Sequence, residues 1–257
     1  MKPDAADVSD DAFLDGRVVV SQPRHGHRAG IDAVFLAAAI PAVDGDRVLE
    51  AGSGTGIVAL LIAHHVAGAL LTGVEIEPEL VALARSNAAR NGCSERVRFI
   101  AADVTAAHAT LAAAGLAADS FDHVIANPPF FGADEGTASP RALKRRAGVI
   151  APGGLANWAR FLAAMARPGG SATLVHRAAA LPALLAVLDG RFGGIAVYPL
   201  FPRSGDAASR VLVRGRKGSR APLRLLPGMV LHEDDGNAFS AEAKAVLAGG
   251  ARIDLGA

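Results

Sequence analysis

Short apolar runs alternate with longer stretches of helical spacing through most of the chain. Each run is rich in Val, Ile or Leu and is typical of a strand buried on both faces of a parallel sheet. The pattern predicts strands over 16–23, 47–52, 70–76, 97–103, 121–127, 171–177, 194–201 and 208–215. It predicts helices over 31–40, 55–66, 78–92, 105–115, 155–166, 181–190 and 239–250.

Strands that alternate with helices indicate a mainly parallel sheet with helices on both faces. The predicted fold class is α/β, a Rossmann-like doubly wound sheet of about seven strands. A short polar link joins the last two strands and predicts a C-terminal antiparallel hairpin. We expect a single domain, with a lead-in strand and helix (1–45), a Rossmann-like core (46–220) and a C-terminal tail (221–257).

Composition narrows the class of protein further. The chain is 51% hydrophobic, and its acidic amino terminus lacks the apolar region of a signal peptide. No apolar stretch is long enough for a membrane span, and Cys93 is the one cysteine. The histidines stand at no metal-ligand spacing with acids or with Cys93, so no metal site is expected. These features predict a soluble, cytoplasmic protein.

The charge is unevenly distributed although the formal net charge is only +1. Residues 141–224 contain fifteen of the 26 basic residues but only two acids, Asp189 and Asp206. Such polarity favours a polyanionic partner such as RNA, and the alternative is a solvated basic face.

The predicted strand ends carry the candidate chemistry, because ligands of open α/β sheets bind beyond the carboxyl ends of the strands. The first strand of the core ends in "LEAGSGTG", which contains Glu50, Gly52, Gly54 and Gly56. Glycines allow a tight turn and a close approach of the backbone to a ligand. The spacing is G-x-G-x-G and not the G-x-G-x-x-G of dinucleotide sites, which disfavours an NAD-dependent oxidoreductase.

Acidic residues follow the next two strands. Glu75 comes twenty-three residues after Gly52, where an acid would accept the hydroxyls of a ribose. Glu77 is the second candidate, or simply an acid at the start of a helix. Asp103 could accept a proton from an exocyclic adenine amine, or cap the helix that is expected near Thr105.

The fourth of these strands ends in "NPPF", residues 127–130. The side-chain oxygen of Asn127 and the carbonyl of Pro128 can accept both hydrogens of an aromatic amine, which makes its nitrogen more reactive. Phe130 can stack on the ring of the substrate. No strong base is required, because catalysis would come mainly from proximity and in-line orientation. A turn is the alternative interpretation of the two prolines.

Taken in order, "VLEAGSGTG", "GVEIEPE", "AAD" and "NPPF" resemble the amino-methylating branch of the class I S-adenosylmethionine-dependent methyltransferases. The lead-in "SQPRHGHRAGIDAVFLAA" (21–38) is similar to that of the bacterial valine-tRNA adenine-N6 methyltransferases, and "RVLVRGRKG" and "FSAEAKAVL" also fit that group. There are two departures, since Phe130 replaces the commoner Tyr and His27 replaces a usual aromatic residue.

The resemblance implies S-adenosylmethionine as the cofactor, bound by the glycine turn, Glu50, Glu75 and Asp103. It also implies that Arg28 and Asp32 approach the methionine end of the cofactor, although Asp32 could instead be a first-turn acid of its helix. Pro129 and Phe131 would contact the substrate. Phosphate contacts are expected from a basic run that could also be merely solvated: Lys144, Arg145 and Arg146.

The leading prediction is therefore methylation of an exocyclic amine, foremost adenine N6 of tRNA next to the anticodon. Guanine N2 of rRNA, a DNA base or a protein glutamine would use the same chemistry. A cofactor-binding RNA assembly factor without turnover is the alternative from another class. The sequence carries no indication of the oligomeric state.

Overall fold

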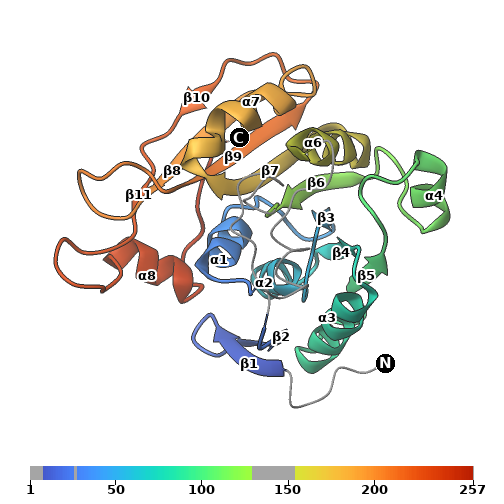
Figure 1. Cartoon of the computed structure of the whole chain (residues 1–257), viewed down its shortest axis with the longest axis horizontal. Helices are drawn as coiled ribbons and strands as arrows, with labels where there is room; N and C mark the ends of the chain where they lie inside the picture. Colours follow the sequence, from blue (N-terminus) through green and yellow to red (C-terminus); the bar gives the residue numbers. More distant parts are fainter. Residues whose placement is uncertain (1–7, 26–27, 129–153, 257) are drawn as a thin grey trace.

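The computed structural model describes residues 8–25, 28–128 and 154–256. Its centre is a nine-stranded sheet in the order β10-β8-β9-β7-β6-β3-β4-β5, with β11 also paired to β8 (Figure 1). The parallel strands are β3 (Arg47–Ala51), β4 (Leu70–Glu75), β5 (Val97–Ala101), β6 (Phe121–Ala126) and β7 (Ala166–Arg177). The predicted α/β class with a mainly parallel sheet is confirmed.

The C-terminal hairpin is also confirmed. β8 (Phe192–Phe201) and β9 (Arg210–Lys217) pair antiparallel, and β9 lies between β7 and β8. Two short strands, β10 (Arg224–Leu225) and β11 (Met229–Val230), then add to β8 in parallel. Both come from the segment that was predicted to be a tail.

The chain reverses its direction of travel across the sheet between β3 and β6. It runs outward from β3 to β4 and β5, and then returns to place β6 on the other side of β3. Such a reversal leaves a crevice at the carboxyl ends of the two strands, where doubly wound proteins bind ligands. The glycine turn after β3 and Asn127 after β6 flank this crevice.

Helices cover both faces of the sheet, and the buried apolar residues form one cluster on each face. One cluster includes α1 (Ile31–Ala38), α2 (Ile57–His65), α3 (Pro78–Arg90) and α8 (Ala241–Leu247). The other includes α4 (His108–Ala113), α6 (Gly154–Met165) and α7 (Leu181–Leu188), which begins after the short 3-10 helix η2 (Ala178–Ala180). Every residue of α2 from Ile57 to Ala63 is buried, which explains why this helix is apolar all round.

A separate two-stranded sheet precedes the core. β1 (Val8–Phe13) pairs antiparallel with β2 (Val18–Pro23), and the connecting turn holds Leu14, Asp15 and Gly16 at positive φ. β1 was not predicted, because Asp10 and Asp11 interrupt its apolar pattern. The Asp15–Gly16 pair was the available signal, since Asp-Gly is a favoured hairpin turn.

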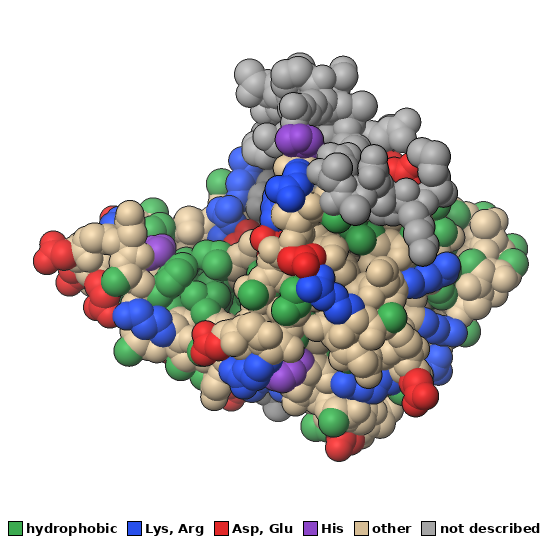
Figure 2. Space-filling model, turned by 90° about the horizontal axis from the view of Figure 1, so that it is seen from below, with side chains coloured by type: hydrophobic (Ala, Val, Ile, Leu, Met, Phe, Trp, Pro, Cys, Tyr) green, Lys and Arg blue, Asp and Glu red, His purple; other side chains and the backbone are tan. Residues whose placement is uncertain are grey.

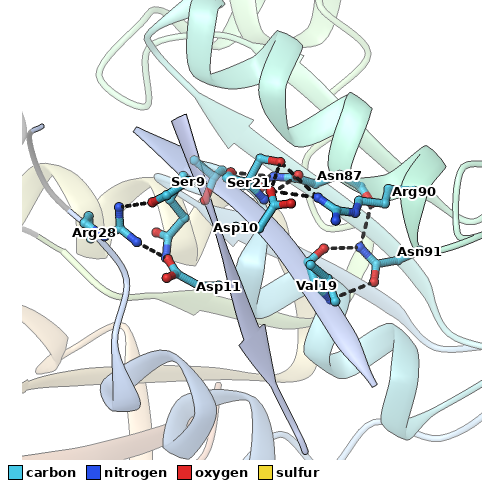
Figure 3. A network of polar contacts seen from close by, with 11 residues as sticks. Ser9, Asp10, Asp11, Val19, Ser21, Arg28, Asn87, Arg90 and Asn91 are labelled. Atoms are coloured by element: carbon cyan, nitrogen blue, oxygen red, sulfur yellow. Dashed lines mark hydrogen bonds and ion pairs between the residues drawn. The ribbon is translucent and has the colours of Figure 1, made fainter. Parts of the chain in front are cut away.

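Two asparagines attach this hairpin to the body of the protein, Asn87 within α3 and Asn91 directly after it (Figure 3). The Asn91 amide accepts a hydrogen bond from Val19 N and donates one to Val19 O. Asn87 makes the same pair of bonds with the backbone of Ser21. The two side chains therefore take the place of a neighbouring strand along the edge of β2.

Candidate cofactor and acceptor site

The glycine turn after β3 has the predicted tight geometry. Gly52, Gly54 and Gly56 have φ values of 66°, 54° and 85°, a region that favours glycine. A Cβ atom on Gly52 would lie 2.5 Å from Trp158 Cη2, and one on Gly56 would lie 2.4 Å from Phe99 Cζ. At Gly54 a Cβ atom would meet nothing within 4 Å. The turn is thus packed at both ends and open at its middle.

Glu75, at the end of β4, lies against the middle of this turn. Its Oε2 accepts a hydrogen bond from Gly54 N at 2.9 Å, and its Oε1 accepts from the N–H groups of Ile76 and Glu77. Ile76 is 58% exposed although it is large and apolar. An apolar surface beside a carboxylate suits a nucleoside, whose base is flat and whose sugar carries hydroxyls. Sequence reasoning missed Ile76, and its signal was an apolar residue directly after the acid.

Glu50 lies beneath the turn and is buried. Burial raises the pKa of its carboxyl group well above the usual range, and the nearby charge of Glu75 raises it further. A hydrogen bond from Ala59 N at 3.0 Å acts in the opposite direction. A buried acid at this place would gain from a cationic ligand, which a methyl sulfonium with an amino group provides.

Asp103 stands beyond β5 and closes a turn. Its Oδ1 accepts hydrogen bonds from the Thr105 N–H at 2.7 Å and from the Thr105 hydroxyl at 2.8 Å. This turn delays the next helix, so that α4 begins at His108 and not at 105 as expected. Asp103 therefore does not cap α4, whose N-cap is Ala107, and its contact with the cofactor stays a prediction.

A cavity of about 380 Å³ opens beside Asn127. Pockets for small ligands span roughly 300–1,000 Å³. Three separate parts of the chain form its remaining walls: residues 28–32 of the lead-in, the link between β8 and β9, and the segment after β11. His232 of the last segment stacks on Phe239 with ring centroids 4.7 Å apart. Neither the C-terminal walls nor His232 was singled out from the sequence, because no local motif marks them.

Arg28 and Asp32 both line this cavity, and each is held by an opposite charge. Arg28 forms an ion pair with Asp11 and donates to Ser9 Oγ at 2.7 Å (Figure 3). Asp32 accepts from Arg210 Nε at 3.0 Å, and it also lies in the first turn of α1. The structure therefore brings both residues to Asn127, and their approach to the methionine end of the cofactor stays a prediction.

Trp158 of α6 is partly buried and packs against the apolar cluster of its face. Its ring also covers Gly52, so it contacts the glycine turn as well. It is the only tryptophan of the chain.

Several predicted site residues lie outside the described residues: Pro129, Phe130, Phe131, Lys144, Arg145 and Arg146. Pro128 is described and buried directly after Asn127. The roles proposed for the six others stay predictions.

The described basic residues of 141–224 do not share one surface. Arg177, at the end of β7, pairs in register with Arg210 near the cavity, whereas Arg216 pairs with Ser171 at the opposite end of that strand. Arg214 is buried between α1 and the C-terminal segment. Figure 2 likewise shows Lys and Arg side chains in separate groups on one face. Among the described residues, the basic side chains of this stretch therefore lie on more than one part of the surface.

Neither a metal site nor a membrane-spanning helix is present among the described residues. No group of three or more His, Cys, Asp or Glu in that part of the chain could hold a metal ion. None of the helices described is long and apolar enough to cross a membrane.

Comparisons with known proteins agree with this geometry. The family described as "Methyltransferase domain" matches residues 48–154, which run from β3 through the "NPPF" motif. A solved structure from Agrobacterium tumefaciens, described as a predicted O-methyltransferase, is 28% identical with a TM-score of 0.74, and covers 87% of this chain and 98% of its own. The fold and the site define a class I S-adenosylmethionine-dependent methyltransferase.

Curated relatives identify the family more closely. The tRNA1(Val) (adenine(37)-N6)-methyltransferase of Aeromonas hydrophila is 31% identical over 203 residues, which cover 77% of this chain and 80% of that protein. The release factor glutamine methyltransferase of Chlorobaculum tepidum is 30% identical over 146 residues, but these cover only 55% of this chain and 48% of that protein. The chain belongs to the tRNA1(Val) (adenine(37)-N6)-methyltransferase family.

The residues at the strand ends fit the cofactor of this class. Gly54 offers open space, Glu75 provides a carboxylate, Ile76 provides an exposed apolar surface and Glu50 provides a buried acid. The NAD alternative is correspondingly weakened, because the turn lacks the dinucleotide spacing and the family is one of methyltransferases. S-adenosylmethionine is the cofactor of this enzyme.

Proposed function

We propose that this enzyme methylates N6 of an adenine in tRNA, next to the anticodon. The observation that carries the proposal is the cavity beside Asn127, at the strand end next to the glycine turn. The identity of the acceptor is supported by the name of the Aeromonas hydrophila relative, which aligns with most of this chain.

Asn127 and Pro128 would act on the acceptor amine. S-adenosylmethionine supplies an electrophilic methyl group on a positively charged sulfur. The oxygen of the Asn127 amide and the carbonyl of Pro128 accept the two N–H hydrogens, which directs the nitrogen lone pair away from the base ring. The cofactor, held by the glycine turn and Glu75, would supply the methyl group that this lone pair attacks, and S-adenosylhomocysteine would be the leaving group. The nitrogen then releases a proton to solvent, so that no strong base is needed. Proximity and alignment supply most of the acceleration.

The charges of the cavity wall favour a base over a phosphate. Arg28 is paired with Asp11, and Arg210 is paired with Asp32. Because each of these cations already has a counter-ion, the wall attracts a phosphate only weakly. An uncharged heteroaromatic ring needs no such attraction, and its desolvation costs little free energy. A base in folded RNA must be unpaired or flipped out to reach such a cavity.

A protein glutamine is the second candidate acceptor, because the Chlorobaculum tepidum relative acts on one by its name. That similarity covers only about half of either chain. The Aeromonas hydrophila relative covers more of this chain, which favours the tRNA acceptor.

The test is to incubate the purified enzyme with radiolabelled cofactor and separate pools of tRNA, rRNA, DNA and release-factor protein. Label in N6-methyladenosine of tRNA is the expected result. A tRNA transcript with guanine in place of the target adenine is the matched control and should remain unlabelled. Label in protein glutamine or in guanine N2 would overturn the acceptor assignment and leave the methyltransferase class unchanged.

A further inference from the structure

The side chain of Asn87 connects the glycine turn of the cofactor site to β2, which leads into the wall of the acceptor cavity. It lies in α3 and is only 1% exposed. Its Oδ1 accepts from Ser21 N at 2.9 Å, and its Nδ2 donates to Ser21 O and to Thr55 O, each at 3.0 Å. Ser21 belongs to β2, whereas Thr55 belongs to the glycine turn. One buried amide thus satisfies three backbone groups from two segments.

The connection continues from Ser21 to the cavity wall through the next residue. Gln22 is 2% exposed, and its Oε1 accepts from Ala29 N at 2.9 Å. Its Nε2 donates to Ala29 O and to Asp11, which also binds Arg28. These contacts close the chain reversal between β2 and α1. They help to fix residues 28–32, which line the cavity beside Asn127.

We propose that Asn87 is a positioning residue for methyl transfer. By holding Thr55 and Ser21 to the same helix, it keeps the cofactor turn and the lead-in wall of the cavity at a fixed separation. Methyl transfer needs this, because a misplacement of about 1 Å can reduce a rate by roughly 100-fold. The part concerning the acceptor rests on the proposed function, whereas the part concerning the cofactor turn does not.

Asn91 provides a matched control one helical turn further along the chain. Its Oδ1 accepts from Val19 N at 3.1 Å, and its Nδ2 donates to Val19 O and Asn87 O, each at 2.8 Å. It therefore holds β2 in the same way, but its side-chain bonds go to β2 and to α3. Aspartate at either position has the same shape as asparagine and removes both donated bonds. The two variants differ in the contact with the glycine turn and in burial, because Asn87 is buried and Asn91 is only partly buried; the serine pair separates these two effects, since it introduces no charge.

The experiment compares Asn87→Asp with Asn91→Asp in the full chain. Urea unfolding measures stability, calorimetry measures the Kd of S-adenosylhomocysteine, and steady-state assays measure kcat and KM. We expect both variants to lose stability. Only Asn87→Asp should weaken S-adenosylhomocysteine binding by roughly tenfold, raise KM for S-adenosylmethionine and lower kcat. Asn91→Asp should keep the Kd within about twofold of wild type.

Equal affinities for S-adenosylhomocysteine in the two folded variants would overturn the proposal, because Asn87 would then contribute to stability and not to the geometry of the site. If an aspartate variant does not fold, Asn87→Ser and Asn91→Ser allow the same comparison with a smaller, uncharged side chain. The Kd readout needs no acceptor. An inactive wild type on tRNA would therefore contradict the proposed function without deciding the role of Asn87.

Discussion

At the residue scale, the buried carboxylate of Glu50 has two opposed effects. Its charge lowers the stability of the folded protein, but the same charge favours the binding of a cationic cofactor. Its raised pKa means that the folded protein holds this proton more tightly than the unfolded chain does. The resulting stabilisation is complete below the unfolded pKa, near 4.5, and is lost as the pH rises through the folded pKa. In Glu50→Gln this loss should disappear. Wild type should therefore lose unfolding free energy relative to the variant as the pH rises above the unfolded pKa, which urea titrations over a pH series measure.

The same substitution has a second expected effect, on the cofactor. The introduced glutamine amide can still accept the hydrogen bond of Ala59 but carries no charge for a cationic ligand. Stability curves that stay parallel across the pH range would show that Glu50 has an ordinary pKa. A variant that is more stable near neutral pH but binds S-adenosylmethionine more weakly would show that the buried acid serves the ligand.

Asn127 should separate chemistry from cofactor binding. Asn127→Ala removes one of the two acceptors for the substrate amine, and we expect methyl transfer to fall by roughly two orders of magnitude or more. Binding of S-adenosylhomocysteine should change little, because the cofactor is assigned to the first three strand ends. The fluorescence of Trp158, the only tryptophan, can report this binding because its ring lies against Gly52. Equal loss of binding and transfer in a folded variant would assign Asn127 to the cofactor or to the architecture.

At the element scale, the end of α1 depends on arginines from distant segments. Arg214 of β9 donates to Ala39 O, directly after the helix, and to Gly256 O at 3.1 Å. Arg214→Met keeps most of the apolar stem and leaves these carbonyls without their donor. We expect a loss of about 1–3 kcal/mol of unfolding free energy in urea titrations. Arg216→Met, on the same strand but exposed, should stay within about 0.5 kcal/mol of wild type. Equal effects would show that Arg214 does not stabilise α1.

The elements that sequence could predict are those whose own residues carry the signal. Pro78 and Gly92 mark the limits of α3, and the apolar run from Val124 to Ala126 marks β6. The glycine turn and Glu75 could be placed together because parallel strands end at one edge. The cavity wall could not be predicted, because Asp32 and Arg210 are 178 residues apart and meet only in the folded chain. The attachment of the first hairpin by Asn87 and Asn91 was missed for the same reason.

At the scale of the whole molecule, the binding of RNA depends on which basic residues face the site. Arg177 and Arg210 lie at the strand ends near Asn127. Three other arginines are exposed at the opposite end of the strands, where β8 begins and β9 ends: Arg191, Arg216 and Arg220. If net charge alone governed RNA binding, both groups would contribute equally. The geometry instead predicts that, of these described residues, RNA contacts those at the strand ends that carry the glycine turn and the cavity.

The salt dependence of tRNA binding tests this prediction together with the phosphate contacts expected from Lys144, Arg145 and Arg146, which lie outside the described residues. Replacing Lys144, Arg145 and Arg146 by alanine should flatten the slope of log K against log salt by roughly two to three, because each phosphate contact contributes about 0.7 to 0.9. The control replaces Arg191, Arg216 and Arg220 by alanine, which changes the net charge equally. Its slope should match that of wild type, since these residues lie away from the proposed RNA path. Filter-binding titrations across a salt series measure both. If the two triple variants flattened the slope to the same extent, the RNA would be responding to net charge and not to a defined surface at the site.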